Sequence, residues 1–314
     1  TILTCMDRET GALVRMPLAS PPLHVDIPRH GVMGAYALAR AGRHDLVRKR
    51  IDFYLDAVRE TDSPGRPAGS VPAALYTNGQ EAVPHLVLDA QAAAWVLWLC
   101  AEYSRALIPE ERAAFVDAIW PKVELAAEFL AAWQDPRTGM PRTAFNPDTL
   151  RDDQPPELVV RTYMGLESGL ALAKLAGQDR PEWRKRLQEL EAIIRANYMG
   201  PDGFWNVARP ERLWNISLVP RTHPRWHESL SNSVGQLFVS GPSPEVSCET
   251  VFAAAVMLPP GADARKKAGY LLETGKLDNM LIPPALGLGS SIPDSYLAAL
   301  QYVAWMELAP PGTP

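Results

Sequence analysis

The sequence has few cysteines and none at a metal-site or redox spacing. Its 314 residues include three cysteines, Cys5, Cys100 and Cys248, and no C-x-x-C pair occurs. An odd number of scattered thiols does not build a disulfide framework. Cys100 lies inside the apolar run "WVLWLCAEY", so we expect free and mostly buried thiols.

Other absences exclude whole classes of protein. No run is long and apolar enough to span a bilayer, so we expect no membrane contact. Thirty-one basic residues stand against 36 acidic ones, which gives a net charge of -5 and argues against a nucleic-acid partner. Residues 1–20 carry charges that a signal peptide would lack. We expect a cytoplasmic protein, with secretion through a signal removed before Thr1 as the alternative.

Cofactor motifs are also missing. The sequence holds no P-loop and no Rossmann glycine pattern, so it indicates no nucleotide cofactor. His223 and His227 have an H-x-x-x-H spacing but lack the glutamate of a zinc helix. We therefore expect neither a metal nor any other cofactor.

Strand-like alternation is nearly absent, apart from "LWNISLV", and helical patterns fill the chain. Five apolar runs each follow a proline, which suits the first position of a helix. These runs begin at Pro28, Pro84, Pro156, Pro244 and Pro293. Their uniform apolarity predicts helices buried on most sides.

Charged, amphipathic helices are predicted between these buried ones. Examples are "RHDLVRKRIDFYLDAVRE" and "RPEWRKRLQELEAIIRANYM". An alternation of buried and half-exposed helices predicts an all-α fold, a toroid of helical hairpins. We expect residues 1–314 to form one such domain, with "TILTCM" as the last turn of a first helix that begins upstream.

In a toroid of this kind the inner helices point their N-termini at one end. The loops before those helices would then meet around one funnel, where free N–H groups favour anionic and hydroxyl-bearing ligands. The polar residues at these places are the candidates for a site. We predict His30, Asp152 and Asp153 as catalytic groups, and Asp26, Arg29, Tyr76, Glu81 and Asp294 as substrate-binding groups.

The tryptophans divide by context. Trp205 and Trp226 fall in stretches that we interpret as loops, where an indole could stack on a flat ligand face, so both join the predicted substrate-binding residues. The remaining helical tryptophans are expected in the core; they are Trp95, Trp98, Trp120 and Trp305.

Three segments resemble the glucoamylases and related trehalase-like enzymes, glycoside hydrolase family fifteen. "DIPRHGVMGAYALARAG" is similar to the W-x-R-D segment of that family and the helix that follows it. "LYTNGQEAVPHLVLDAQAAAWVL" resembles its Y-x-x-D-G turn and L-D-x-Q-G helix. "DRETGALVRMPLASPP" resembles its D-x-x-T-G-A-I-V-A-S entry. The match is good over residues 7–105 and poor after residue 200.

The resemblance implies an (α/α)6 barrel, a sugar-sized pocket and an inverting reaction by two carboxylates. The chain departs from the family at these places. Arg29-His30 stands where the family has R-D, and Asp148, Asp152 and Asp153 occupy the window of the general acid. Pro283-Pro284 stands at the place of the base, and Asp278 and Asp294 are the nearest carboxylates.

Three functions follow from this pattern. The first is a glucoamylase-like protein that binds a small, sugar-like molecule in the funnel without the ordinary carboxylate pair. The second is an acid/base enzyme, an isomerase or cyclase, that uses His30 with Asp152 or Asp153 on a non-glycan metabolite. The third is a non-catalytic binding or scaffold protein.

Overall fold

The structure is a computed structural model of the whole chain. It describes residues 2–14, 24–82, 90–142, 156–203, 205–207, 213, 224–239, 248–273 and 295–309. All structural statements below concern these ranges.

Helices make up most of the described chain. A 3-10 turn η1 (Ile2–Thr4) begins it, and a two-stranded antiparallel sheet pairs β1 (Val25–Asp26) with β2 (Leu75–Tyr76). The α-helices are α1 (Pro28–Arg40), α2 (His44–Asp56), α3 (Ala90–Ala106), α4 (Pro109–Ala132), α5 (Pro156–Leu175), α6 (Pro181–Tyr198), α7 (Pro224–Val239), α8 (Cys248–Met257), α9 (Asp263–Glu273) and α11 (Ser295–Leu308).

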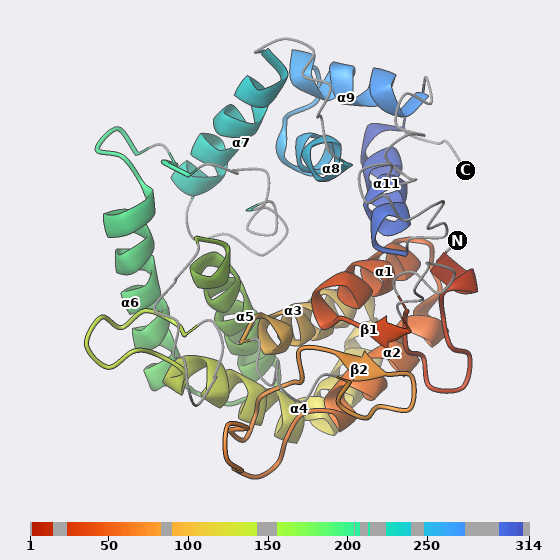
Figure 1. Cartoon of the computed structure of the whole chain (residues 1–314), viewed down its shortest axis with the longest axis vertical. Helices are drawn as coiled ribbons and strands as arrows, with labels where there is room; N and C mark the ends of the chain where they lie inside the picture. Colours follow the sequence, from red (N-terminus) through yellow and green to blue (C-terminus); the bar gives the residue numbers. More distant parts are fainter. Residues whose placement is uncertain are drawn as a thin grey trace.

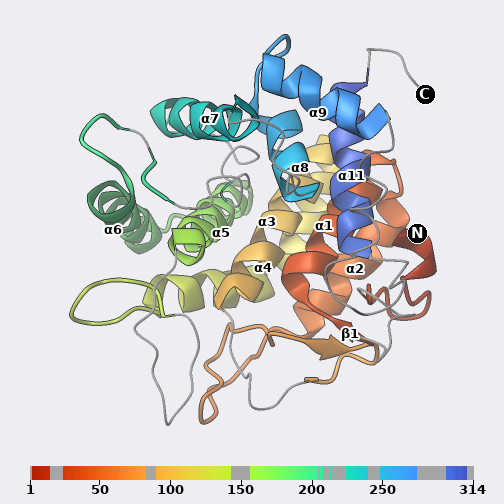
Figure 2. The same ribbon diagram turned by 45° about the horizontal axis from the view of Figure 1, so that its top comes forward.

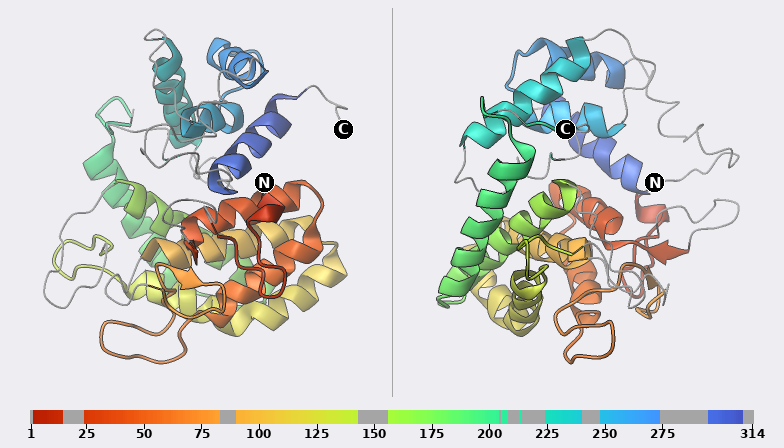
Figure 3. Two further views of the ribbon diagram at one scale, coloured as in Figure 1. Left: turned by 45° about the vertical axis from the view of Figure 1, so that its right-hand side comes forward. Right: turned by 60° about the vertical axis from the view of Figure 1, so that its left-hand side comes forward.

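The helices form a ring with an inner and an outer layer, which confirms the predicted all-α toroid (Figure 1). Packing runs from α5 to α3, α1, α11 and α8, and these five are called the inner helices here. The more polar helices α2, α4, α6 and α9 lie outside them. Figure 3 shows α1–α6 as one side of the molecule and α7–α11 as the other, joined where α11 lies along α1.

The inner helices are apolar around most of their circumference because neighbours cover them on several sides. Helix α3 buries thirteen of its seventeen residues, whereas the outer helix α6 buries only Trp183, Arg186, Leu190 and Ile194. Small residues allow the close packing: a Cβ added to Gly165 of α5 would lie 2.6 Å from the Cβ of Ala94 on α3. The predicted pairing of a buried helix with an amphipathic one is confirmed.

Proline begins five of these helices, as its fixed φ and missing N–H favour. Pro28 and Pro156 start inner helices as predicted. The predicted starts at Pro84, Pro244 and Pro293 lie outside the described residues, and the helices there are described from Ala90, Cys248 and Ser295.

Two expectations about tryptophan are wrong. Trp226 lies in helix α7 rather than in a loop, and it packs on Tyr163 of α5 with ring centroids 5.4 Å apart. Helix α7 also packs on α8, so it links the two sides of the ring. Trp305 was expected in the core but is 39% exposed. The apolar pattern of α11 did not reveal this, because one of its faces lines a surface groove.

Among the described helices, none combines the length and the apolarity that a membrane-crossing segment requires.

Candidate functional site

Polar side chains from all five inner helices lie near the N-terminal ends of those helices. Each comes from the first or second turn, and contacts across helix boundaries tie them into two groups. We call this set the mouth cluster; it consists of His30 on α1, Gln91 on α3, Arg161 on α5, Glu249 on α8 and Tyr296 on α11. The inner helices therefore gather their N-termini at one end, as predicted.

One half of the mouth cluster connects three helices through Tyr296. Its hydroxyl donates a hydrogen bond to Glu249 Oε1 at 2.9 Å, and its ring lies 4.6 Å from the His30 imidazole, centroid to centroid. His30 is 8% exposed, while Tyr296 and Glu249 are half-buried. The contact thus holds a carboxylate at a place that solvent still reaches.

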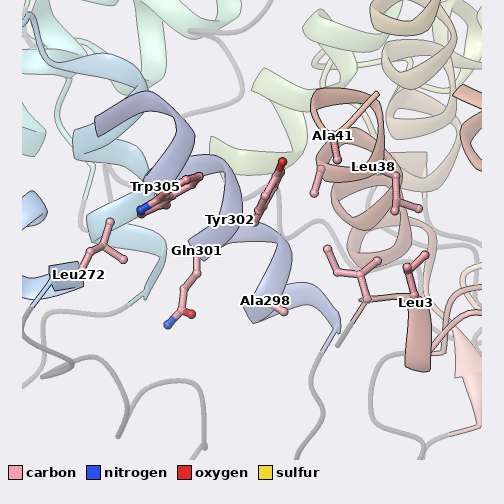
Figure 4. Close-up of a pocket in the computed structure, with 10 residues that line it drawn as sticks. Leu3, Leu38, Ala41, Leu272, Ala298, Gln301, Tyr302 and Trp305 are labelled. Carbon is pink, nitrogen blue, oxygen red and sulfur yellow. The ribbon is translucent and has the colours of Figure 1, made fainter. Parts of the chain in front are cut away.

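The orientation of α11 indicates which way Tyr296 points. Ala298, Gln301 and Trp305 lie along one stripe of this helix and line a groove on the outer surface (Figure 4). Residues two and nine positions apart lie about 200° and 180° apart around an α-helix, since each residue turns it by about 100°. Tyr296 therefore lies on the opposite face of α11, toward the ring axis.

The other half of the mouth cluster joins α3 to α5. The Arg161 guanidinium donates a hydrogen bond to the Gln91 side-chain oxygen and lies 5.6 Å from the ring centre of Trp95. Both polar side chains are half-buried, and Trp95 is 2% exposed. A cation above an aromatic face is held in place by the ring quadrupole. This half supplies N–H donors where the first half supplies a carboxylate.

Asp26 lies beneath the mouth in a fully enclosed cluster. Its carboxylate forms an ion pair with Arg50 of α2 and accepts hydrogen bonds from the Tyr54 hydroxyl at 2.8 Å and the Leu13 N–H at 2.7 Å. Burial raises the pKa of the Tyr54 hydroxyl well above its usual value, with the charge of Asp26 acting in the same direction. At 0% exposure Asp26 does not reach a bound molecule in this conformation.

Gly31 gives this enclosed cluster its space. A Cβ at Gly31 would lie 2.7 Å from Asp26 Oδ1 and would also overlap Arg50 and Tyr54. Because Asp26 ends β1 and Gly31 lies in the first turn of α1, the cluster fixes the start of α1 and with it His30. Asp26 was predicted to bind a ligand, whereas its described contacts hold β1, α1 and α2 together.

The remaining predicted binding residues near α1 and α3 are spread over the rim. Arg29 is exposed, and Tyr76 on β2 is 46% exposed. Glu81 accepts hydrogen bonds from Arg59 and Arg66, each at 3.1 Å. Figure 2 shows β1 at the end of the molecule where these segments lie.

Trp205 and Trp226 are buried against each other rather than presented to a ligand. Their ring centroids are 5.9 Å apart, and the Trp205 indole N–H donates to the Trp226 carbonyl at 3.1 Å. Their exposed fractions are 6% and 1%. Of the predicted catalytic residues, His30 joins the mouth cluster, whereas Asp152 and Asp153 lie outside the described residues, as does Asp294.

Four members of the mouth cluster were not among the predicted site residues: Gln91, Arg161, Glu249 and Tyr296. A signal for them exists, since each is a polar residue near the start of an otherwise apolar helix. The prediction weighted the loops before the helices instead. Within the described residues, no cluster of three or more His, Cys, Asp or Glu side chains is arranged to hold a metal.

A second concave region lies on the outside of the ring, between α1 and α11. This groove has a volume of about 600 Å³ and is lined mainly by apolar side chains, among them Leu3, Leu38, Leu272 and Trp305 (Figure 4). It contains no charged lining residue. Its chemistry differs from that of the mouth, and it does not suit a hydroxyl-rich ligand.

Solved structures with the same arrangement of helices include several glycosidases. One glycosidase superimposes with a TM-score of 0.67 at 13% identity, over 98% of this chain and 94% of its own. A glycosidase variant in complex with glucose gives 0.64 at 14% identity with the same coverage. The GH63 mannosylglycerate hydrolase from Thermus thermophilus, also in complex with glucose, gives 0.60 at 11% identity over 96% and 97%.

At these identities the likeness defines the fold. The chain has the all-α toroidal fold of these glycosidases, the (α/α)6 barrel that its resemblance to glycoside hydrolase family fifteen implied. No family model and no curated protein matches the sequence.

Proposed function

We propose that this protein is a glycoside hydrolase-type enzyme that binds a monosaccharide-sized sugar unit in the mouth cluster. The observation that carries the proposal is the convergence of polar side chains from five inner helices at one end of the ring. Each of these helices is otherwise apolar, so the polar side chains at their starts stand apart from the core pattern and share one end of the ring.

The chemical composition of the mouth cluster suits a sugar. Sugar hydroxyls both donate and accept hydrogen bonds, and the cluster offers acceptors on Glu249 and Gln91 and donors on Arg161 and Tyr296. The buried tryptophan beneath Arg161 adds an apolar floor on that side. A site for a purely anionic ligand would not place a carboxylate among its central groups.

The structural neighbours support the same ligand class. Two of them were solved in complex with glucose, and they share this fold over nearly their whole length. The general acid of the reaction stays assigned to Asp152 or Asp153, which precede the inner helix α5. His30 stays a predicted site residue through its contact with Tyr296.

The test is a ligand-induced rise in melting temperature. Glucose, maltose and trehalose are added to the whole chain, and a ligand at about one hundred times its Kd adds about 2.7 kcal/mol to the free energy of unfolding. The proposal expects a rise with at least one sugar and its loss in Arg161→Met. The matched control is Arg40→Met, because Arg40 lies at the opposite end of α1 and pairs with Glu307. No rise with any sugar, or an equal loss in Arg40→Met, contradicts the proposal.

A further inference from the structure

We propose that Glu249 is the general base of this enzyme and that Tyr296 is the residue that positions it. The inference rests on the proposed function, since it assigns the carboxylate that activates water at the same mouth. The inference goes beyond the proposed function by naming a residue in the first turn of α8, away from the loops in which carboxylates were predicted.

The first step is the position of the carboxylate. Glu249 is the second residue of α8 and half-buried, and a helix N-terminus favours a negative group there. Its partner Tyr296 is the second residue of α11, so the contact spans two neighbouring inner helices. Glu249 is the carboxylate that Tyr296 ties into the mouth cluster, and Glu157 in the first turn of α5 is a second half-buried carboxylate at the start of an inner helix.

The second step is the direction of the hydrogen bond. Tyr296 donates its hydroxyl proton to Glu249 Oε1 at 2.9 Å, so that oxygen is an acceptor. A general base must accept a proton, and a carboxylate that accepts this bond from Tyr296 is suited to that role.

The third step is the support behind the tyrosine. The His30 imidazole packs at 4.6 Å from the Tyr296 ring with the planes tilted by 43°, and the enclosed Asp26 cluster fixes the start of α1 beside it. Three inner helices therefore hold the tyrosine hydroxyl in place. A side chain held by neighbouring packing keeps a catalytic group within the narrow range of geometry that reaction requires.

The reaction balances as one displacement. Glu249 takes a proton from water as the water oxygen forms a bond to the anomeric carbon of the sugar. The glycosidic C–O bond breaks, and the departing oxygen receives a proton from a carboxylic acid, the second group of an inverting pair. The candidates for that acid come from the sequence alone and are Asp152 and Asp153. Water is consumed, and proton exchange with solvent restores both carboxyl groups.

The experiment measures kcat and KM of Glu249→Gln and Tyr296→Phe on maltose, trehalose and an aryl α-glucoside. Loss of a general base typically costs about 10²- to 10⁴-fold in rate. We expect Glu249→Gln to lose that much in kcat with KM changed by less than about threefold. We expect Tyr296→Phe to lose about tenfold in kcat, with Glu249→Asp keeping partial turnover. Formate added to Glu249→Ala should restore part of the turnover.

The matched control is Glu307→Gln. Glu307 is also a half-buried glutamate that links α11 to α1, through Arg40, but it lies at the other end of α11. Its variant should keep the wild-type kcat. If Glu249→Gln turns over like the wild type, or if KM rather than kcat changes in both mouth variants, the assignment of Glu249 is wrong although the proposed function stands.

Two further results separate this inference from the proposed function. If the wild type binds a sugar but cleaves none of the substrates, a sugar-binding mouth stands and the general base is overturned. If it neither binds nor cleaves them, the proposed function fails and the assignment of Glu249 fails with it.

Discussion

Asp26 and Glu249 are two carboxylates held by the same kind of bond in very different surroundings. Each accepts a hydrogen bond from a tyrosine hydroxyl, Tyr54 at 2.8 Å and Tyr296 at 2.9 Å. Asp26 also pairs with a guanidinium and is 0% exposed, whereas Glu249 is half-buried and stands at the first turn of an inner helix.

The difference separates stability from reactivity. A fully enclosed ion pair gains from good geometry, but it is expensive to break because the surviving charge is left without solvent. A half-buried carboxylate keeps access to water and substrate, and its loss leaves no stranded charge. We therefore expect changes in the Asp26 cluster to alter folding and changes at Glu249 to alter turnover.

Removal of Arg50 should have the largest effect on stability. Arg50→Met leaves the Asp26 charge buried and removes the donor to the Gly11 carbonyl, so we expect a loss of about 3–5 kcal/mol in the free energy of unfolding. Urea denaturation measures it. The control Arg48→Met breaks a half-exposed pair with Asp52 one turn away and should cost at most about 1 kcal/mol. Equal losses in the two variants would contradict the comparison.

The two tyrosines give the sharpest matched test. Tyr54→Phe removes a donor to a buried carboxylate and should cost about 1.5–3 kcal/mol of unfolding free energy. Tyr296→Phe makes the same chemical change at a half-buried partner, where solvent replaces the lost bond, so we expect about 0.5–1 kcal/mol. Chemical denaturation of both variants under one condition checks the order. A larger loss in Tyr296→Phe would show that the mouth is the more structural region.

Gly31 tests whether the enclosed cluster has spare room. A Cβ there would overlap groups of Arg50, Tyr54 and Asp26, so Gly31→Ala should destabilise by about 1–3 kcal/mol through overpacking. Gly269 in α9 is the control because no atom lies within 4 Å of its added Cβ. Gly269→Ala should instead stabilise by about 0.5–1 kcal/mol, since alanine is the better helix former. Thermal melts of both variants decide the sign.

The sequence predicts the layers of this fold better than its site. Buried and amphipathic helices follow from local patterns, and prolines at residues 28 and 156 mark helix starts without any knowledge of the tertiary contacts. These features depend on residues three or four positions apart, which the sequence displays directly.

The site depends on partners that the sequence does not place together. Asp26 was predicted to face a ligand, but its partner Tyr54 comes from another helix 28 residues away. Glu249 was not predicted because its partner Tyr296 lies 47 residues later in the sequence. A second carboxylate was expected in the segment just before α11. The structure instead brings Glu249 of α8 to the start of α11. The prediction that Trp305 lies in the core was wrong for the same reason, because its exposure depends on what packs on the outer face of α11.

Alkaline pH gives the smallest expected difference. Burial raises the folded-state pKa of Tyr54, so above pH 10 the unfolded chain loses this proton while the folded protein keeps it. Stability from this group is complete below pH 10 and falls as the pH rises toward the folded value. Linkage gives a loss of about 0.8 kcal/mol in the free energy of unfolding at pH 10.5.

Between pH 9 and 10.5, Tyr54→Phe should therefore lose about 0.8 kcal/mol less unfolding free energy than the wild type. The control Gly269→Ala should follow the wild type. Parallel curves for Tyr54→Phe and wild type in urea denaturation would mean that solvent reaches this hydroxyl, and the contrast between an enclosed and an open carboxylate would fail at its enclosed end.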